Sequence, residues 1–481
     1  MFLSKRITGL ALPHVVAASV VAVSLTILAP CEANAQALDF IRDAEIENTI
    51  RLYATPLFQQ AGVDPKAVQI HLVQDATLNA FVAEGLNLFL NTGLIIATDD
   101  PGQLIGVIAH ECGHIAGGHL VRGQEAMGNA MTTGIAAMVL GLAAAIAAGH
   151  QDQSAQRQGV PGAWNNNTGA LLPAVMGAAG EVAYKQYASF SRTIEGSADT
   201  AGLTFLDNLH MSARGMLAFM EKLEGQELLV SSRQDPYVRT HPLTQDRIDE
   251  IRHHVENSPW SDVPPPPEFT EPHQRMRAKL SAFLSPPVST LYKYKADDRS
   301  ISARYARAIA YYRIPDLEHA LPLIDGLIAE RPTDPYFHEL RGQMLFENGR
   351  AAEAVPEYQL AVKSLPENAL LRQELGQVEV ETEDPALLAD AKLQLTFATR
   401  QEPDDPGSWR LFATAYGRDG DEVMAAAGMA EYALLVGRYS EALYDANKAL
   451  KGLKHGTPVA IRMEDVRAQA EQGRDAQARQ R

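Results

Sequence analysis

The pattern of hydrophobic and polar positions divides the chain into parts that are built differently. An apolar run, densest from Val15 to Ala29, lies near the amino terminus. A second apolar run, Thr132 to Ala148, consists mostly of Ala, Gly, Met and Leu. Beyond Tyr292 the pattern is that of amphipathic helices, with Ala and Gly recurring at fixed intervals. The pattern therefore predicts a mainly α-helical protein with a distinct carboxy-terminal part.

Residues 1–35 have the pattern of an export signal. Two basic residues precede the first apolar run, and Ala33 and Ala35 supply small side chains at positions −3 and −1 of a cleavage site. Two alternatives remain open. One is an uncleaved anchor, since Ile7 to Ala29 is nearly long enough to span a bilayer. The other is lipidation at Cys31, against which the preceding proline argues. The sequence favours cleavage near Ala35 and export.

The carboxy-terminal helices repeat every 34 residues. Gly342 and Gly376 are 34 residues apart, as are Pro332 and Pro366. Small residues at such positions let two antiparallel helices approach closely, and the proline ends the second helix. This spacing is that of tetratricopeptide repeats (TPR), whose stacked units form a concave groove that binds protein segments. The unit after Gly376 is about three residues too long. We therefore expect a TPR α-solenoid with one irregular repeat over residues 296–481.

A proline-rich segment separates the two parts. It includes Pro264 to Pro267, a run that favours a stiff extended linker because proline cannot sit inside a helix. We therefore divide the chain into an export signal (1–35), an amino-terminal domain (36–257), a linker (258–295) and the repeat domain (296–481).

The composition narrows the possible functions. The chain of 481 residues is long enough for two or three domains with real cores. Its 59 acidic residues exceed its 42 basic ones, and the resulting net charge of −17 argues against a nucleic-acid partner. Two cysteines are too few for a disulfide-stapled scaffold or a Cys-rich zinc module. Cleavage of the signal would leave Cys112 as the only thiol, so the exported protein has no internal disulfide.

The candidate chemistry lies on one apolar, Ala-rich stretch that contains two histidines. His110 and His114 are four residues apart, or about 400° of α-helix, so both imidazoles project from nearly the same face. Two ring nitrogens one turn apart can bind a single Zn²⁺ ion. Glu111 then faces a water held there, from which it can pass a proton to a leaving amine. The alternative, buried histidines without a metal, would leave three polar groups to be satisfied in an apolar stretch.

A third zinc ligand has two sources in the sequence. One is His119. A third histidine ligand from the same segment would lie six residues after His114, however, and that position is Leu120. His119 is rotated from that direction by about 100°, so we expect it beside a ligand or on the surface. The other source is a later helix, where Glu195 and Asp199 share one face. Glu195 can bind the metal while Asp199 accepts the free N–H of a ligand histidine. Alternatively, the two form a surface pair of acids.

The two motifs, one starting at His110 and one at Glu195, together resemble the zinc metallopeptidases that include HtpX and the CAAX prenyl proteases. The export signal and the repeats make the chain similar to the periplasmic, BepA-like branch of that family in Gram-negative bacteria. The resemblance implies a gluzincin-type α+β metallopeptidase domain with a small sheet at residues 36–257, and one Zn²⁺ ion per chain. The implied ligands are His110, His114 and Glu195, with Asp199 behind them and Glu111 as the general base.

The same resemblance extends to residues outside these motifs. It places His241, within a Thr-His-Pro tripeptide, and Arg247 beside the metal as catalytic residues. His241 either stabilises an oxyanion or occupies the fourth zinc position and holds the enzyme closed. By composition alone, the tripeptide is only a turn before a helix. The resemblance also implies that Leu86 to Leu90 is an edge strand that pairs with substrate.

These observations support two functions. The first is a periplasmic zinc endopeptidase that hydrolyses unfolded or misassembled outer-membrane proteins, although affinity ordering alone does not single out zinc. The second is an assembly factor or chaperone for outer-membrane proteins that uses the TPR groove, with proteolysis gated or vestigial. The expected partners are polypeptide substrates and the outer-membrane assembly machinery. We expect residues 132–148 to be buried or to contact a membrane peripherally, at the outer membrane, and residues 151–168 to form a loop.

Overall fold

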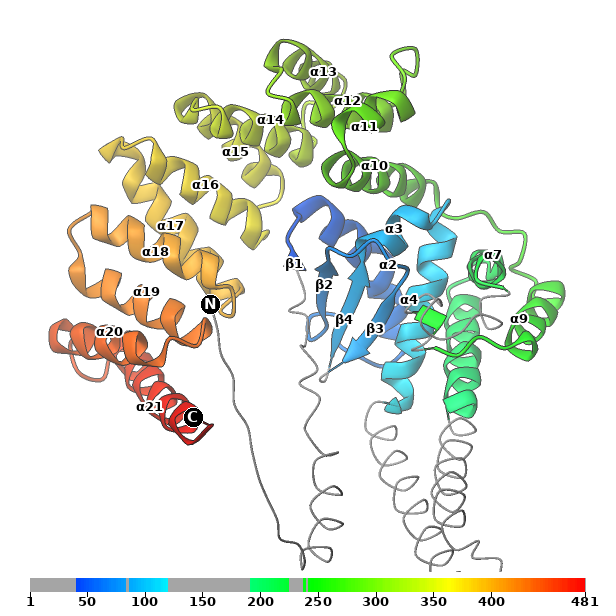
Figure 1. Cartoon of the computed structure of the whole chain (residues 1–481), viewed down its shortest axis with the longest axis horizontal. Helices are drawn as coiled ribbons and strands as arrows, with labels where there is room; N and C mark the ends of the chain where they lie inside the picture. The colour runs from blue at the N-terminus through cyan, green and yellow to red at the C-terminus, as the bar shows by residue number, and fades with distance from the viewer. Residues whose placement is uncertain (1–39, 84–85, 120–190, 225–236, 239–240, 481) are drawn as a thin grey trace, which may run out of the picture. The chain divides into compact units, whose positions relative to one another are not determined.

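The computed structural model describes five parts of the chain: residues 40–83, 86–119, 191–224, 237–238 and 241–480. The expected export signal, the apolar run 132–148 and the loop 151–168 lie outside the described residues. Within them, helices predominate beside one small sheet, which confirms the predicted fold class (Figure 1). None of the helices in these parts combines the length and the apolar character that crossing a membrane requires.

A four-stranded sheet begins the amino-terminal domain. Its strands are β1 (Phe40–Ile41), β2 (Gln69–Val73), β3 (Ala80–Ala83) and β4 (Asn87–Asn91), and they lie in the order β1-β2-β4-β3. β2 and β4 are parallel, whereas the other two pairs are antiparallel. Side chains alternate along β4, so that Leu88 and Leu90 join the buried core while Phe89 lies half-buried on the opposite face.

The expectation that Leu86 to Leu90 forms an edge strand is wrong. β4 includes most of this segment and lies between β2 and β3, with a hydrogen-bonded neighbour on each side. The full burial of Leu88 and Leu90 suits this central position, because a central strand is the one most completely covered. The edges of the described sheet are β1 and β3, and β3 is the one that contacts α4 (Pro101–Gly117) (Figure 1).

The described residues of this domain also contain α2 (Ala44–Gln60), α3 (Thr92–Ala97), a helix over residues 191–208, α7 (Arg214–Lys222) and α9 (Gln245–Asn257). The local sequence defines both ends of α4. Before its first residue, the carboxylate of Asp100 accepts hydrogen bonds from the backbone N–H groups of Gly102 and Gln103. After its last residue, Gly118 adopts a φ of +61°, a conformation that favours glycine. Most of α4 is buried, including Cys112.

Small residues let α4 approach two neighbouring helices at backbone distance. A Cβ atom at Gly113 would overlap the backbone of Ala198 on the 191–208 helix. A Cβ atom at Gly106 would lie 2.6 Å from the Cα atom of Met216 on α7. Any side chain at these positions would therefore push the helices apart. The close approach brings the acidic pair of the 191–208 helix up to the histidines of α4.

The segment 258–295 is not the extended linker that we predicted. It contains α10 (Pro267–Leu284) and α11 (Pro287–Lys293), and the longest part without helix is the one before Pro267. Pro267 occupies the first position of α10, where a backbone N–H is not needed. The last proline of the run therefore begins a helix, while the prolines before it lie outside helix. Pro272 lies inside α10 and removes one backbone hydrogen bond, which the burial of residues such as Met276 and Leu280 offsets. The domain limits at 257 and 295 stay a prediction.

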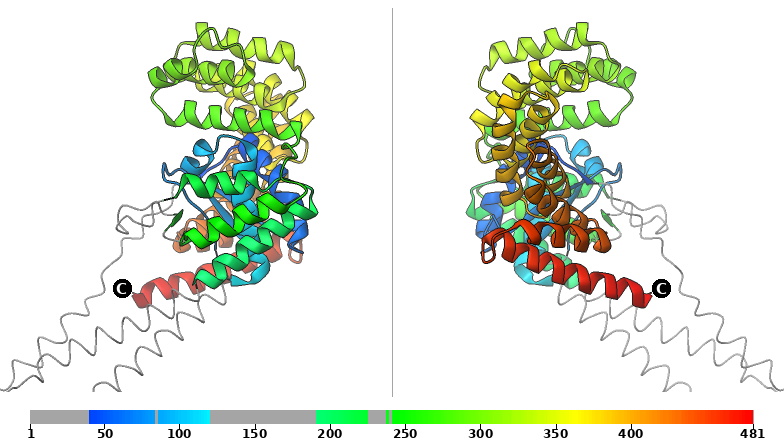
Figure 2. Two further views of the ribbon diagram at one scale, coloured as in Figure 1. Left: turned by 90° about the vertical axis from the view of Figure 1, so that its right-hand side faces the viewer. Right: turned by 90° about the vertical axis from the view of Figure 1, so that its left-hand side faces the viewer.

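The repeat region consists of helices that pack in chain order, from α12 to α21 (Figures 1 and 2). These helices are α12 (Ile301–Arg313), α13 (Leu317–Glu330), α14 (Pro335–Glu347), α15 (Ala351–Ser364), α16 (Ala369–Glu381), α17 (Pro385–Gln401), α18 (Pro406–Arg418), α19 (Glu422–Leu435), α20 (Tyr439–Gly452) and α21 (Pro458–Gln480). The predicted small positions lie at helix contacts: a Cβ atom at Gly342 would meet the ring of Tyr358 at 2.8 Å. The irregular unit is explained by α17, which has 17 residues where α13 and α15 have 14 each.

Candidate metal centre

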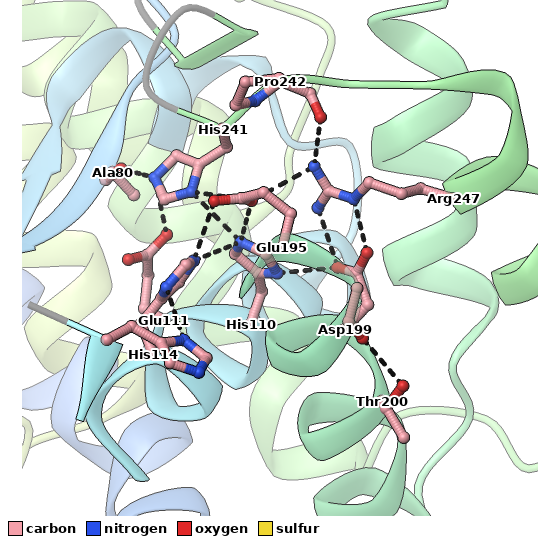
Figure 3. A network of polar contacts seen from close by, with 12 residues as sticks. Ala80, His110, Glu111, His114, Glu195, Asp199, Thr200, His241, Pro242 and Arg247 are labelled. Atoms are coloured by element: carbon pink, nitrogen blue, oxygen red, sulfur yellow. Dashed lines mark hydrogen bonds and ion pairs between the residues drawn. The ribbon is translucent and has the colours of Figure 1, made fainter. Parts of the chain in front are cut away.

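The four candidate metal ligands come from three segments of the chain. α4 carries His110 and His114, the 191–208 helix carries Glu195, and His241 lies shortly before α9. All four side chains are buried, with exposed fractions of 0% to 8%. Figure 3 shows them converging, although the sequence separates His110 from His241 by 131 residues.

The donor atoms of these side chains have the spacing of a tetrahedral site. His110 Nε2 lies 3.0 Å from His114 Nε2 and 3.3 Å from Glu195 Oε2. His241 Nδ1 lies 3.3 Å from both His110 Nε2 and Glu195 Oε2. With zinc–ligand bonds of about 2.0–2.1 Å, the ligand atoms of a tetrahedron are about 3.3 Å apart. All four donor atoms lie within 4.8 Å of one another. The residues therefore fit one small divalent cation.

The charges around the cluster favour ligand forms that can bind a cation. Burial opposes the charge of Glu195, but the charge of His241 and hydrogen bonds from the histidines hold the pKa of Glu195 well below its usual value. Burial lowers the pKa of His114, which keeps this imidazole neutral. Burial also opposes the charge of His110, yet Asp199 and Glu195 outweigh it and raise the pKa of His110 to about 10. A cation would therefore have to displace a proton from His110.

Asp199 and Arg247 contact the candidate ligands on the side away from the cluster. The Nδ1 atom of His110 lies 2.8 Å from Asp199 Oδ1, so that His110 donates from Nδ1 and turns Nε2 to the cluster. Arg247 donates to both oxygens of Asp199, over 2.6 and 2.9 Å, and its Nη1 atom lies 3.2 Å from Glu195 Oε2. Burial opposes the charge of Asp199, but His110 and Arg247 lower its pKa to about 2. The structure thus places Arg247 against the carboxylates.

Glu111 is the unusual polar group of the site. Its side chain is fully buried, and neither carboxylate oxygen has a hydrogen-bond partner among the described residues. The nearest ionic neighbour is His241, whose Nε2 atom lies 3.5 Å from Glu111 Oε1. A buried carboxylate without a partner is unfavourable, which points to a polar ligand beside it.

His241 connects the cluster to the edge strand. Its Nε2 atom lies 3.3 Å from the carbonyl oxygen of Ala80 on β3, which leaves Nδ1 facing the other donors (Figure 3). The ring of Tyr237 lies against it, with centroids 4.8 Å apart. The sequence reasoning missed Tyr237, although its position four residues before His241 is a signal that would have revealed it. His119 lies beside His114 and outside the set of donor atoms, which is one of the two places expected for it.

Comparison with known proteins adds an independent line of evidence. The model of peptidase family M48 matches residues 41–255. The beta-barrel assembly-enhancing protease of Yersinia pestis is 24% identical over 410 residues, which cover 79% of this chain and 75% of that protein. The protein of the same name from Escherichia coli K12 is 24% identical over 429 residues, with 87% and 81% covered.

Among solved structures, YrrB, a TPR protein, is 17% identical, with 37% of this chain and 91% of that chain covered and a TM-score of 0.31. The matched range 41–255 contains every one of the candidate site residues, from His110 to Arg247. The chain therefore carries a metallopeptidase domain of family M48 ahead of its helical repeats.

Proposed function

We propose that this protein is a zinc-dependent endopeptidase whose single metal ion is held by His110, His114 and Glu195. The observation that carries the proposal is the convergence of these donors, at 3.0 to 3.5 Å, beside the carboxylate of Glu111, whose oxygens accept no hydrogen bond from the described residues. Two imidazoles and one carboxylate form a donor set that suits zinc and leaves a position for the reaction.

The side chains divide the work of hydrolysis. When bound, the ion supplies Lewis-acid polarisation of the scissile carbonyl. Glu111 takes a proton from the attacking water and delivers it to the leaving amine. Asp199 fixes the orientation of His110, and Arg247 holds Asp199 and Glu195, so we assign Arg247 a positioning role. The edge strand β3 is the natural place for an extended substrate to pair, since its outer backbone groups face no described strand.

His241 supports a gated enzyme. Its Nδ1 atom takes the fourth donor position, at 3.3 Å from two of the other donors, and a substrate needs that position. Movement of the side chain would open that position to the substrate. We therefore propose that the described conformation is closed.

The relatives support a proposal about the substrates, and the expected export signal supports one about the location. Their name describes proteases that enhance β-barrel assembly. We propose that this protein is exported after cleavage near Ala35, works in the periplasm at the outer membrane, and degrades misassembled outer-membrane proteins that its TPR groove helps to hold. The closed position of His241 also favours a second function, in which the repeats assist assembly and proteolysis is rare.

The first experiment separates the base from the metal ligands. Glu111→Gln should abolish cleavage of an unfolded casein substrate while zinc content stays near one ion per chain. Glu195→Ala, in contrast, should lose the zinc. Cleavage that survives in Glu111→Gln would refute the mechanism, and zinc retained by Glu195→Ala would remove Glu195 from the ligand set.

The second experiment tests the gate. His241→Ala should cleave casein faster than the wild type, with unchanged zinc content. An inactive His241→Ala variant that retains its zinc would favour the assembly function over the gated protease.

A further inference from the structure

The chain folds back at the end of α4 and places a third histidine against the second candidate ligand. His119 Nδ1 lies 3.1 Å from His114 Nδ1, and the two rings meet edge to face, at 83° with centroids 5.1 Å apart. His119 is only 6% exposed. The contact is made on the side of the His114 ring opposite to its Nε2 atom, which faces the donors of His110 and Glu195.

Two glycines between His114 and His119 make this contact possible, and each contributes in a different way. Gly118 has a φ of +61° with open space where a Cβ atom would lie, so its contribution is the left-handed turn that reverses the chain. Gly117 contributes space, because a Cβ atom there would overlap the imidazole ring of His119. The two glycines thus allow the chain to turn so that the imidazole of His119 contacts that of His114.

The chemistry of a neutral imidazole indicates which ring donates the hydrogen bond in this contact and which accepts it. If Nε2 of His114 binds a metal, Nδ1 carries the hydrogen and needs an acceptor. Nδ1 of His119, at 3.1 Å, accepts that hydrogen when His119 carries its own proton on Nε2. His110 has the equivalent arrangement, with Asp199 Oδ1 at 2.8 Å from its Nδ1 atom. Both histidines of α4 are therefore held at the nitrogen that points away from the cluster, one by a carboxylate and the other by an imidazole.

We propose that His119 is a positioning residue for the metal site: it accepts the Nδ1–H of His114, which fixes the tautomer and the ring orientation of that ligand. The proposal rests on the proposed function, in which His114 binds zinc. His119 does not bind the metal itself and takes no part in the chemical step. Gly117 and Gly118 allow this contact.

The test measures zinc affinity of the full chain by competition with a chelator, together with the visible absorption of the Co²⁺-substituted protein. His119→Phe keeps a ring of similar size but no acceptor, and it should weaken zinc binding by about 10- to 100-fold and alter the Co²⁺ spectrum. His119→Asn retains an acceptor oxygen and should bind closer to the wild type. Gly117→Ala should weaken binding as His119→Phe does, with little further loss when the two are combined.

The outcomes separate this proposal from the one on which it rests. Wild-type affinity and an unchanged Co²⁺ spectrum in His119→Phe would overturn the positioning role while leaving the metal site intact. Equal losses in His119→Phe and His119→Asn would also overturn it, because packing would then be the cause. Unchanged zinc binding in His114→Ala would instead show that His114 is not a ligand, and the proposed function itself would fail. Thermal unfolding of the metal-free variants reports whether each one folds.

Discussion

Two buried acids of the candidate site, Asp199 and Glu195, share the guanidinium of Arg247. Arg247 is 4% exposed and donates twice to Asp199, while its Nη1 atom also donates to the carbonyl of Pro242 over 2.8 Å. The planar fork of arginine matches a carboxylate in a way that the single ammonium of lysine does not. At the scale of residues, therefore, we expect the ion pairs of Arg247 to stabilise the folded protein as well as to position the site.

Arg247→Met should destabilise the metal-free protein by about 3–5 kcal/mol, because it leaves buried carboxylates without their partner. Arg252 on the same helix is a matched control: its side chain is 36% exposed and pairs with Glu221 and Asp249. Arg252→Met should change the free energy of unfolding far less, because solvent screens its ion pairs. Urea unfolding measures both values, and equal losses would show that burial does not set the contribution of Arg247.

His273 gives the protein a calculable pH dependence. It is fully buried, donates from Nε2 to the carbonyl of Thr98 over 3.2 Å, and burial lowers its pKa to about 4. An unfolded histidine has a pKa of about 6.5, so between these values the unfolded chain binds more protons than the folded one. The free energy of unfolding therefore rises with pH across this window, and acidification from pH 7 to 4 removes about 2–3 kcal/mol of it.

Replacing His273 by Leu should remove most of that pH dependence, even though it also costs the hydrogen bond. The measurement is the difference between the free energies of unfolding at pH 7 and pH 4.5. His455→Leu is the control, since the side chain of His455 is 92% exposed. A pH difference in His273→Leu as large as that of the wild type would contradict the assignment.

At the scale of elements, the site depends on how closely two helices approach. α4 carries both histidines and Glu111, and the 191–208 helix carries Glu195 and Asp199. Gly113 and Ala198 form the closest of the contacts that glycines make between the two helices, and Gly202 makes another with Ala109. Glycine usually weakens a helix, and here its small volume is what allows donor atoms on separate helices to meet.

Gly113→Ala should therefore reduce both stability and zinc content, because the added methyl group separates the two helices that hold the ligands. We expect a loss of about 1–3 kcal/mol. Gly196 on the 191–208 helix is a matched control, as nothing lies within 4 Å of a Cβ atom there. Gly196→Ala should be neutral or stabilising by about 0.5–1 kcal/mol. Zinc retained at one ion per chain in Gly113→Ala would contradict this account.

At the scale of the whole molecule, α10 connects the M48 domain to the repeats. Phe269, Met276 and Leu280 of α10 belong to the core of the amino-terminal domain, whereas Ala278 and Ala282 belong to the first core of the repeats. Arg275 of α10 also contacts both regions: it lies 2.7 Å from Glu45 of α2 and 2.6 Å from Asp334, which precedes α14. One helix thus takes part in two cores, which couples their folding.

Lys279 of α10 tests this coupling. It is 2% exposed, and its Nζ atom lies 2.7 Å from Asp43, 3.4 Å from Glu45 and 3.7 Å from Glu339. Lys279→Met should destabilise the protein by about 3–5 kcal/mol, since three acids then share the site without that cation.

Lys448→Met serves as the control, because the side chain of Lys448 is 47% exposed and pairs with Glu422, which is itself exposed. It should change the free energy of unfolding far less than Lys279→Met does. A calorimetric scan that shows separate transitions for the two regions in Lys279→Met, but one in the wild type, would support the coupling. Identical scans for Lys279→Met and the wild type would refute it.

Local periodicity allowed much of this protein to be predicted from the sequence alone. A spacing of four residues puts His110 and His114 on one helix face wherever that helix lies, and a 34-residue period produces helix pairs in any context. The position of Glu195 and Asp199 on one helix face has the same local origin. For these features the covalent geometry of the helix is sufficient.

Only the tertiary structure decided which of these local features meet. The backbone contact at Gly113, the position of Arg247 on Asp199, the central place of β4 and the helical continuation beyond Pro267 all depend on segments that are distant in sequence. Such contacts are set by the packing of whole elements, where volume and burial override local preference. A spacing along the chain determines a direction on a helix, whereas a distance between two helices exists only once both are packed.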